Sequence, residues 1–229
     1  SGEIGELRHM QHTYVLQPWS NASSWRRSMK ESGGLFCEKL CHYVDLPRWW
    51  DGTPIEEFFI AKASNILPGE FEPIDNCELT YRFRSGCVSH LTFMMGAAAC
   101  HELDVTEEQA ARMPRTDEFF IFRYVFVGTQ GGITASLWHR DLIVFHHSGK
   151  PGVDRPARMA RMRCWDKKDD WREFHNTPDQ NVDIARRVAN GLPPAVDVDD
   201  VARTMYFCYA CEEAVQQPWA VHAFEPPRE

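Results

Sequence analysis

The order of hydrophobic and polar positions predicts a chain that mixes strands with helices. Alternating apolar and polar residues, or a cluster of aromatic and β-branched residues, are typical of a β-strand. The segments with such a pattern are residues 12–19, 40–46, 78–85, 88–96, 118–128 and 203–211. The sequence therefore predicts a sheet as the main element of the fold.

Two segments carry helix signals instead. Thr53 and Pro54 are followed by two acidic residues, an order typical of a capped helix start, and the Leu-Pro-Gly sequence at 67–69 predicts where that helix ends. Residues 179–190 repeat apolar side chains every three or four positions and end at Gly191. We expect both segments to be amphipathic helices that cover the sheet.

Three stretches have less regular patterns. Residues 133–147 have helical spacing, but the His-Arg-Asp sequence at 139–141 is also compatible with a tight turn, so both a helix and a hairpin stay open. Residues 157–175 have the pattern of two strands around a charged turn, although the first half is also compatible with a helix. The polar stretch 104–117 predicts a loop with a short helix in it.

Together these elements predict an α+β fold, an antiparallel sheet with its helices gathered on one face. The chain of 229 residues is long enough for one large domain with a real core. We expect a flexible leader at 1–11, a single domain at 12–215 and an irregular tail at 216–229.

Charge limits which partners the chain can bind. The formal net charge of −8 argues against bulk binding of nucleic acid through the field of the whole molecule. It leaves room for a short nucleotide ligand, which needs only a local basic patch. Residues 154–172 contain such a patch, with seven basic side chains against four acidic ones.

The eight cysteines allow more than one interpretation. We find no hydrophobic leader and no apolar run of membrane-spanning length, so we expect a cytoplasmic protein with reduced thiols and no membrane contact. A secreted, disulfide-bonded protein-binding module is the alternative. A zinc-dependent interaction domain is a third possibility, because Cys37, Cys41, Cys208 and Cys211 have ligand-like spacings.

Motifs of common enzymes are absent from the sequence. There is no G-x-S-x-G, no phosphate-binding P-loop and no G-x-G-x-x-G. The His-Arg-Asp sequence at 139–141 lacks the other kinase signatures, and His146 and His147 have no defined carboxylate partner for a metal. We therefore predict a protein that is not an enzyme and has no cofactor and no metal.

An ordered set of segments points to a family. In sequence order they are IEEFF at 55–59, LPG at 67–69, the His101-Glu102 pair, WHRDLIVFHH at 138–147, WREF at 171–174 and VDIARRVANGLPP at 182–194. In that order they resemble the translation initiation factor 4E family, which binds the methylated guanine cap of messenger RNA. The resemblance implies a curved antiparallel sheet backed by helices on its convex face, with the cap pocket on the concave side.

The resemblance also implies a binding site. A cationic 7-methylguanine base gains from two flanking aromatic rings and from a carboxylate at its edge, while basic side chains meet the phosphates. Phe36 or Trp25 takes the place of the first ring, His101 that of the second ring, and Glu102 that of the carboxylate. The implied phosphate and methyl contacts are Arg163, Lys167, Lys168, Arg172 and Trp171, with Phe174 and Trp165 as alternatives for Trp171.

A second surface follows from the same resemblance. The family binds a helical peptide of a scaffold or repressor protein on the face opposite the cap, which here implicates His12, Ile55, Phe59 and Ile143. The expected function is that of a monomeric cap-binding protein that takes part in translation initiation, either by recruiting the translation machinery or by repressing it.

Overall fold

The computed structural model describes residues 2–16, 24–67, 71–96, 121–137, 139–147, 158–174, 176–217 and 219–225. Within these residues the chain forms one nine-stranded sheet with the strand order β8-β7-β6-β5-β1-β4-β3-β2-β9. The strands are β1 (Leu7–Leu16), β2 (Ile55–Ala61), β3 (Asn76–Phe83), β4 (Val88–Met95), β5 (Ile121–Gly128), β6 (Gly131–Ser136), β7 (Asp141–His146), β8 (Arg158–Cys164) and β9 (Val221–Ala223).

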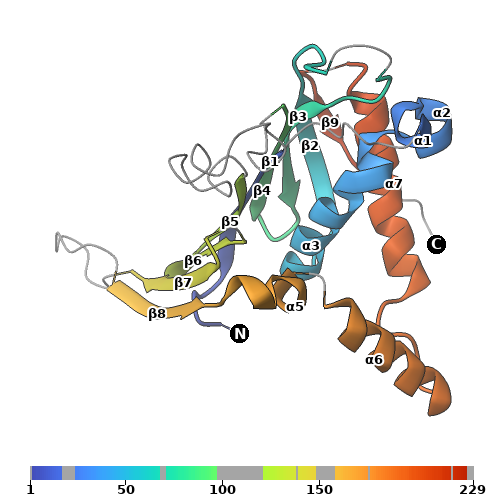
Figure 1. Cartoon of the computed structure of the whole chain (residues 1–229). Coiled ribbons are helices and arrows are strands. Elements are labelled where there is room, and N and C mark those ends of the chain that lie inside the picture. Colours follow the sequence, from blue (N-terminus) through green and yellow to red (C-terminus); the bar gives the residue numbers. More distant parts are fainter. Residues whose placement is uncertain are drawn as a thin grey trace, which may run out of the picture.

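The sheet is mixed, because β1 runs parallel to β4 and places Tyr14 beside Phe93. The other neighbouring strands pair antiparallel. The helices are α1 (Ser24–Arg27), α2 (Met29–Ser32), the π-helix η1 (Phe36–Leu40), α3 (Cys41–Asp51), the 3₁₀-helix η4 (Lys167–Asp169), α5 (Asp170–Phe174), α6 (Thr177–Ala189) and α7 (Val198–Ala214). Figure 1 shows α3 and α7 beside the β2–β3–β4 part of the sheet, whereas α6 projects away from the body.

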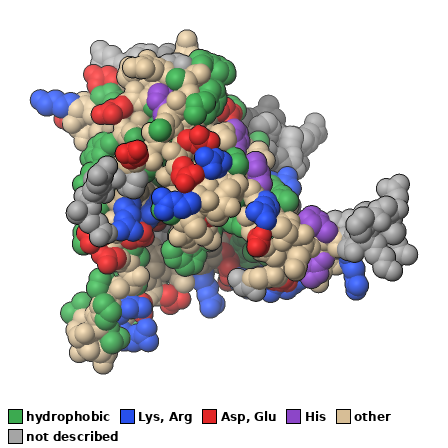
Figure 2. Space-filling view, turned by 180° about the vertical axis from the view of Figure 1, so that it is seen from behind, with side chains coloured by type: hydrophobic (Ala, Val, Ile, Leu, Met, Phe, Trp, Pro, Cys, Tyr) green, Lys and Arg blue, Asp and Glu red, His purple; other side chains and the backbone are tan. Residues whose placement is uncertain are grey.

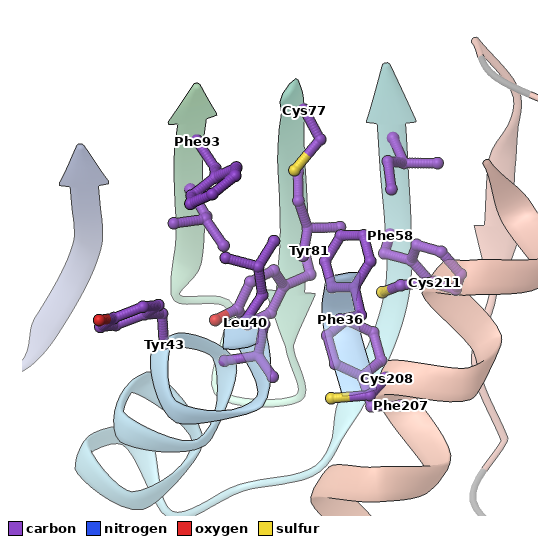
Figure 3. Close-up of a cluster of buried hydrophobic side chains, with 14 of the residues drawn as sticks. Phe36, Leu40, Tyr43, Phe58, Cys77, Tyr81, Phe93, Phe207, Cys208 and Cys211 are labelled. Carbon is purple, nitrogen blue, oxygen red and sulfur yellow. The ribbon is translucent and has the colours of Figure 1, made fainter. Parts of the chain in front are cut away.

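The core lies between this part of the sheet and the helices η1, α3 and α7. Phe36 and Leu40 of η1 and Phe207 of α7 are fully buried there, and Figure 3 shows them facing Phe58 and Tyr81 of the strands. The Phe207 ring meets the edge of the Phe58 ring with 5.3 Å between their centroids. Close packing of large side chains of this kind supplies most of the free energy that opposes chain entropy.

The strand predictions for 78–85, 88–96 and 118–128 are confirmed where the structure describes them, as is the helix at 179–190. The hairpin interpretation of 133–147 is correct, since β6 and β7 pair antiparallel. The first predicted strand exists but begins earlier, at Leu7. The stretch 104–117 lies outside the described residues.

Several other predictions are wrong. Residues 40–46 and 203–211, predicted as strands, lie in helices, and the helix predicted from Thr53 is strand β2. In α7 the buried positions include Thr204, Phe207, Cys208 and Cys211, which is helical spacing within a segment so apolar that it resembles a strand. The second half of 157–175 is helical, and the tail contributes β9.

The predicted curved, antiparallel, cap-binding sheet is also wrong. The observed sheet is open, with β8 and β9 at its two edges. It is mixed because β1 and β4 are parallel at its centre. Seen from behind, the surface mixes acidic, basic, histidine and apolar side chains, and no one kind dominates (Figure 2). In the described part of the chain no helix is both long enough and apolar enough to cross a membrane.

Candidate functional site

A hollow of about 550 Å³ lies beside α3, between that helix, strands β5 and β6, and the segment that leads into α6. We call it the site hollow. It is lined by Lys39, His42, Tyr43, Asp45, Leu46, Phe122, Tyr124, Ala135, Ser136, Leu137, Trp165, Glu173, Thr177 and Gln180. A concave site with a largely aromatic floor and a few polar groups is the usual form of a small-molecule site.

One helix supplies three of the polar groups. Residues 35–51 are continuously helical through η1 and α3, and we call them the site helix. Lys39, His42 and Asp45 are spaced three residues apart, so they share one side of this helix. Lys39 belongs to the π-helical turn η1, and π-helical turns inside α-helices are frequent at functional sites.

Burial changes the proton affinity of the lysine. Desolvation lowers the pKa of Lys39, the nearby Glu38 carboxylate opposes this shift, and the Arg26 guanidinium adds to it. The Lys39 ammonium also lies 5.7 Å from the centre of the Tyr43 ring. A partly buried lysine with a lowered pKa at the edge of a hollow is a candidate for proton transfer or for holding a substrate oxygen.

Aromatic rings form the floor of the site hollow. Tyr43, Phe122 and Tyr124 line it, and His12 lies beneath them, stacked on Tyr124 with 4.0 Å between the ring centroids. Burial lowers the pKa of His12 to about 3, so this imidazole is neutral near neutral pH. The aromatic floor suits the C–H face of a ring-shaped ligand, and the polar rim suits its hydroxyl groups.

The outer wall of the site hollow is held by a bidentate ion pair. Arg140 Nε lies 2.9 Å from Asp170 Oδ1, and its Nη2 lies 3.0 Å from Asp170 Oδ2. The indole N–H of Trp165 donates to the same carboxylate at 3.0 Å. This arrangement fixes the plane of the Trp165 ring against the hollow.

A second hollow of about 820 Å³ lies next to the first. The two share Leu46, Tyr124 and Ala135. The second is mostly apolar, with Trp50 and Phe126 among its walls, and 4.8 Å separates the centroids of these two rings. The site hollow therefore has an apolar neighbour that shares part of its lining.

The two predicted base-binding residues that the structure describes, Phe36 and Trp25, do not line one hollow. Phe36 is fully buried in the core, whereas Trp25 is 40% exposed on α1 with the Arg26 guanidinium 5.1 Å from the centre of its ring. His101 and Glu102 lie outside the described residues.

The predicted phosphate contacts are partly gathered. Arg163 and Arg172 line a further hollow of about 410 Å³ next to Trp165, together with three acidic side chains. Arg163 donates to Glu173 at 2.5 Å, and Lys168 lies 3.4 Å from Asp166. The side chains of Lys167 and Trp171 lie outside the described part of the chain.

The four residues predicted to bind a partner helix are spread over the sheet. His12 and Ile55 are buried, and Phe59 and Ile143 are half-buried. The Phe59 ring meets that of Trp219 at 5.8 Å. These residues come from β1, β2 and β7 and do not form one surface.

Sequence reasoning missed Lys39, His42 and Asp45. Their spacing of three residues is the signal that could have found them, but the strand predicted for 40–46 puts neighbouring side chains on opposite faces. Among the described residues, no group of three or more histidine, cysteine or acidic side chains is placed to hold a metal ion. The seven described cysteines are free thiols.

Comparison with known proteins identifies the fold. A family model described as "Oxidoreductase family, C-terminal alpha/beta domain" matches residues 1–221. Levoglucosan dehydrogenase in complex with NADH is 18% identical with a TM-score of 0.68, and the match covers 99% of this chain and 60% of that chain. An oxidoreductase domain protein from Kribbella flavida is 17% identical with a TM-score of 0.70, and the match covers 98% and 60%.

The WlbA dehydrogenase from Bordetella pertussis, in complex with NADH and UDP-GlcNAcA, is 16% identical with a TM-score of 0.64, and the match covers 99% of this chain and 58% of that chain. The chain thus spans about 60% of the length of these solved structures. No curated protein sequence matches the chain.

These findings correct the functional predictions. The resemblance to translation initiation factor 4E is wrong, and with it cap binding, a role in translation and the partners capped mRNA and a scaffold or repressor protein. The prediction that the chain is not an enzyme is wrong too, and the secreted disulfide-bonded alternative has no support. Since the family model matches nearly the whole sequence, the chain belongs to the oxidoreductase family as its C-terminal alpha/beta domain.

Proposed function

We propose that this chain forms the substrate-binding part of a dehydrogenase that oxidises a hydroxyl group of a sugar or sugar nucleotide with a nicotinamide cofactor. The observation that carries the proposal is the pair Lys39 and His42 on the site helix, set over an aromatic floor. Family membership supports the reaction class. The solved structures of levoglucosan dehydrogenase and the WlbA dehydrogenase support the substrate class.

The chain's own residues do not fit the cofactor. A dinucleotide's pyrophosphate is usually held by a glycine-rich turn at the start of a helix. Nowhere in this sequence are two glycines separated by a single residue. We therefore assign the cofactor to residues outside this chain, and to this chain the binding of the sugar and the handling of its proton.

The roles of the two side chains follow from their chemistry. Oxidation of an alcohol removes a hydride from carbon and a proton from oxygen, so a base must stand at the hydroxyl group. Imidazole suits that task near neutral pH, and we assign it to His42. Lys39 donates a hydrogen bond to the same oxygen and stabilises the negative charge that develops on it.

The test uses the intact enzyme, a panel of sugars and sugar nucleotides, and NAD as the oxidant. His42→Asn and Lys39→Met should each lower kcat between about a hundredfold and ten-thousandfold, the range for one acid–base group. His146→Asn and Lys30→Met are matched controls, because both residues are exposed and neither lines the site hollow. Full activity of His42→Asn, or no oxidation of any member of the panel, would remove the proposal.

Two further predictions from the sequence are kept as proposals. A cytoplasmic location is supported by the free thiols of the seven described cysteines, which suit a reducing compartment. A single domain is supported by the main cluster of buried side chains that the described residues form.

A further inference from the structure

Glu212 of α7 contacts the first turn of the site helix, which packs directly against α7. The backbone N–H of Phe36 donates to Glu212 Oε1 at 2.6 Å, and the two residues are 176 positions apart in the sequence. The first N–H groups of a helix have no partner within it, so this carboxyl group satisfies one of them. Lys39 and His42 follow within two turns of this contact.

The glycine at position 34 leaves room for the Glu212 carboxyl group. A Cβ on Gly34 would lie 2.3 Å from the Glu212 carboxyl carbon and from one of its oxygens. Gly34 also has a φ of +97°, which other residues rarely adopt. A glycine at 34 is thus needed both for the backbone turn and for the approach of Glu212 to the helix.

Within the part of the chain that the structure describes, no charged side chain pairs with Glu212. The titratable groups that face it are thiols: Cys37 from η1, Cys77 from β3, and Cys208 and Cys211 from α7 itself. Among the ion pairs of the described residues, none includes Glu212. Burial raises the pKa of Glu212 to about 7, and the hydrogen bond from Phe36 opposes that shift.

We propose that Glu212 is a positioning residue for the candidate site: it holds the first turn of the helix that carries Lys39 and His42, and burial of its carboxyl group makes this closed arrangement more stable when that group is protonated. The direction follows from linkage. A carboxyl group whose pKa is raised in the closed structure loses its proton on opening to water, so higher pH favours opening. The link between this turn and catalysis rests on the proposed function. The hydrogen bond between Phe36 and Glu212, and its pH dependence, do not.

The experiment measures amide hydrogen exchange of the peptide that spans residues 35–42, corrected for the intrinsic pH dependence of exchange. In the wild-type chain, opening of this turn should increase roughly tenfold between pH 6 and pH 8. Glu212→Gln keeps an oxygen acceptor for Phe36 and removes the titration, so its opening should be low and independent of pH. Glu212→Ala loses the acceptor, so its opening should be high at every pH.

Glu213→Gln is the matched control, because the neighbouring Glu213 is exposed on the same helix and should leave the wild-type pH dependence unchanged. The rate at which Lys39 is acylated, measured by mass spectrometry relative to the exposed Lys30, reports whether Lys39 becomes more accessible when the turn opens. Equal pH dependence in wild type and Glu212→Gln would overturn the inference, as would an Ala variant that exchanges like wild type. Neither readout needs substrate or cofactor, so failure of the dehydrogenase proposal would leave this result interpretable.

Discussion

The two halves of the sheet differ in what covers them. In the half formed by β1, β4, β3 and β2, the site helix and α7 bury large side chains completely, as at Phe83 and Phe93. In the half formed by β5 to β8, every residue of β8 is exposed, and the neighbouring α6 has no buried residue. Both hollows of the candidate site are lined by β5 and β6 of this second half.

This difference in burial distinguishes the half of the sheet that stabilises the fold from the half whose surface is open to other molecules. Val182 and Val188 of α6 are 67% and 77% exposed, although an amphipathic helix normally buries such a face. Because a solvent-exposed apolar stripe costs free energy, a surface that keeps one is usually covered by a partner or a ligand. The covered half therefore explains stability, and the uncovered half is where substrate and further protein should be sought.

The largest expected effect contrasts one residue from each half. Phe207→Ala removes a fully buried ring and should lower the free energy of unfolding by about 3–5 kcal/mol. Val188→Ala on α6 should change it by less than about 0.5 kcal/mol, since that side chain is already in solvent. Urea denaturation of both variants measures the contrast. Similar losses would mean that α6 is packed in solution and that the two halves do not differ as described.

The pH dependence of stability tests the boundary between the two halves, where His12 of β1 lies under the floor of the site hollow. Burial holds the pKa of His12 near 3 in the folded chain, against an ordinary 6.5 when unfolded. The unfolded chain therefore binds the extra proton first, so stability is complete above pH 6.5 and falls as pH decreases. His12→Phe should remove a loss of roughly 3 kcal/mol between pH 6.5 and pH 4.

Glu212 acts in the opposite sense, because its raised pKa favours the folded chain at lower pH. The quantity to compare is therefore the difference in unfolding free energy between wild type and His12→Phe at each pH. If that difference stays constant from pH 6.5 to pH 4, His12 is hydrated and the floor of the site hollow is more open than the structure indicates.

The smallest expected effect concerns the wall of the uncovered half. Arg140→Ala leaves the partly buried Asp170 carboxylate without its bidentate partner and should cost about 1–3 kcal/mol. Arg163→Ala is the control, since its exposed pair with Glu173 should contribute about 1 kcal/mol or less. Urea unfolding followed by tryptophan fluorescence reports both stability and the environment of Trp165. Equal costs would mean that the wall is not held by Asp170.

Local patterns were informative wherever one face of an element stays in solvent. Strand β3 alternates between buried and half-buried residues, and α6 keeps a polar face, so both were identified from periodicity alone. The same reasoning failed for α7 and for residues 40–46. Both segments bury apolar residues against the core, and a short, mostly apolar run has no period that distinguishes a helix from a strand.

The candidate site was missed for a related reason, since the wrong secondary structure at 40–46 separated Lys39 from His42. The amino-acid order alone decided the strands with a solvent face, the helix at 179–190 and the absence of a glycine-rich cofactor loop, because each of these depends on neighbours along the chain. Only the three-dimensional packing decided that β1 lies parallel to β4, that Glu212 meets Phe36, and that Trp165 lines the same hollow as Lys39 and His42. Contacts between residues so far apart follow from the shared burial of many side chains at once, which no local window of sequence contains.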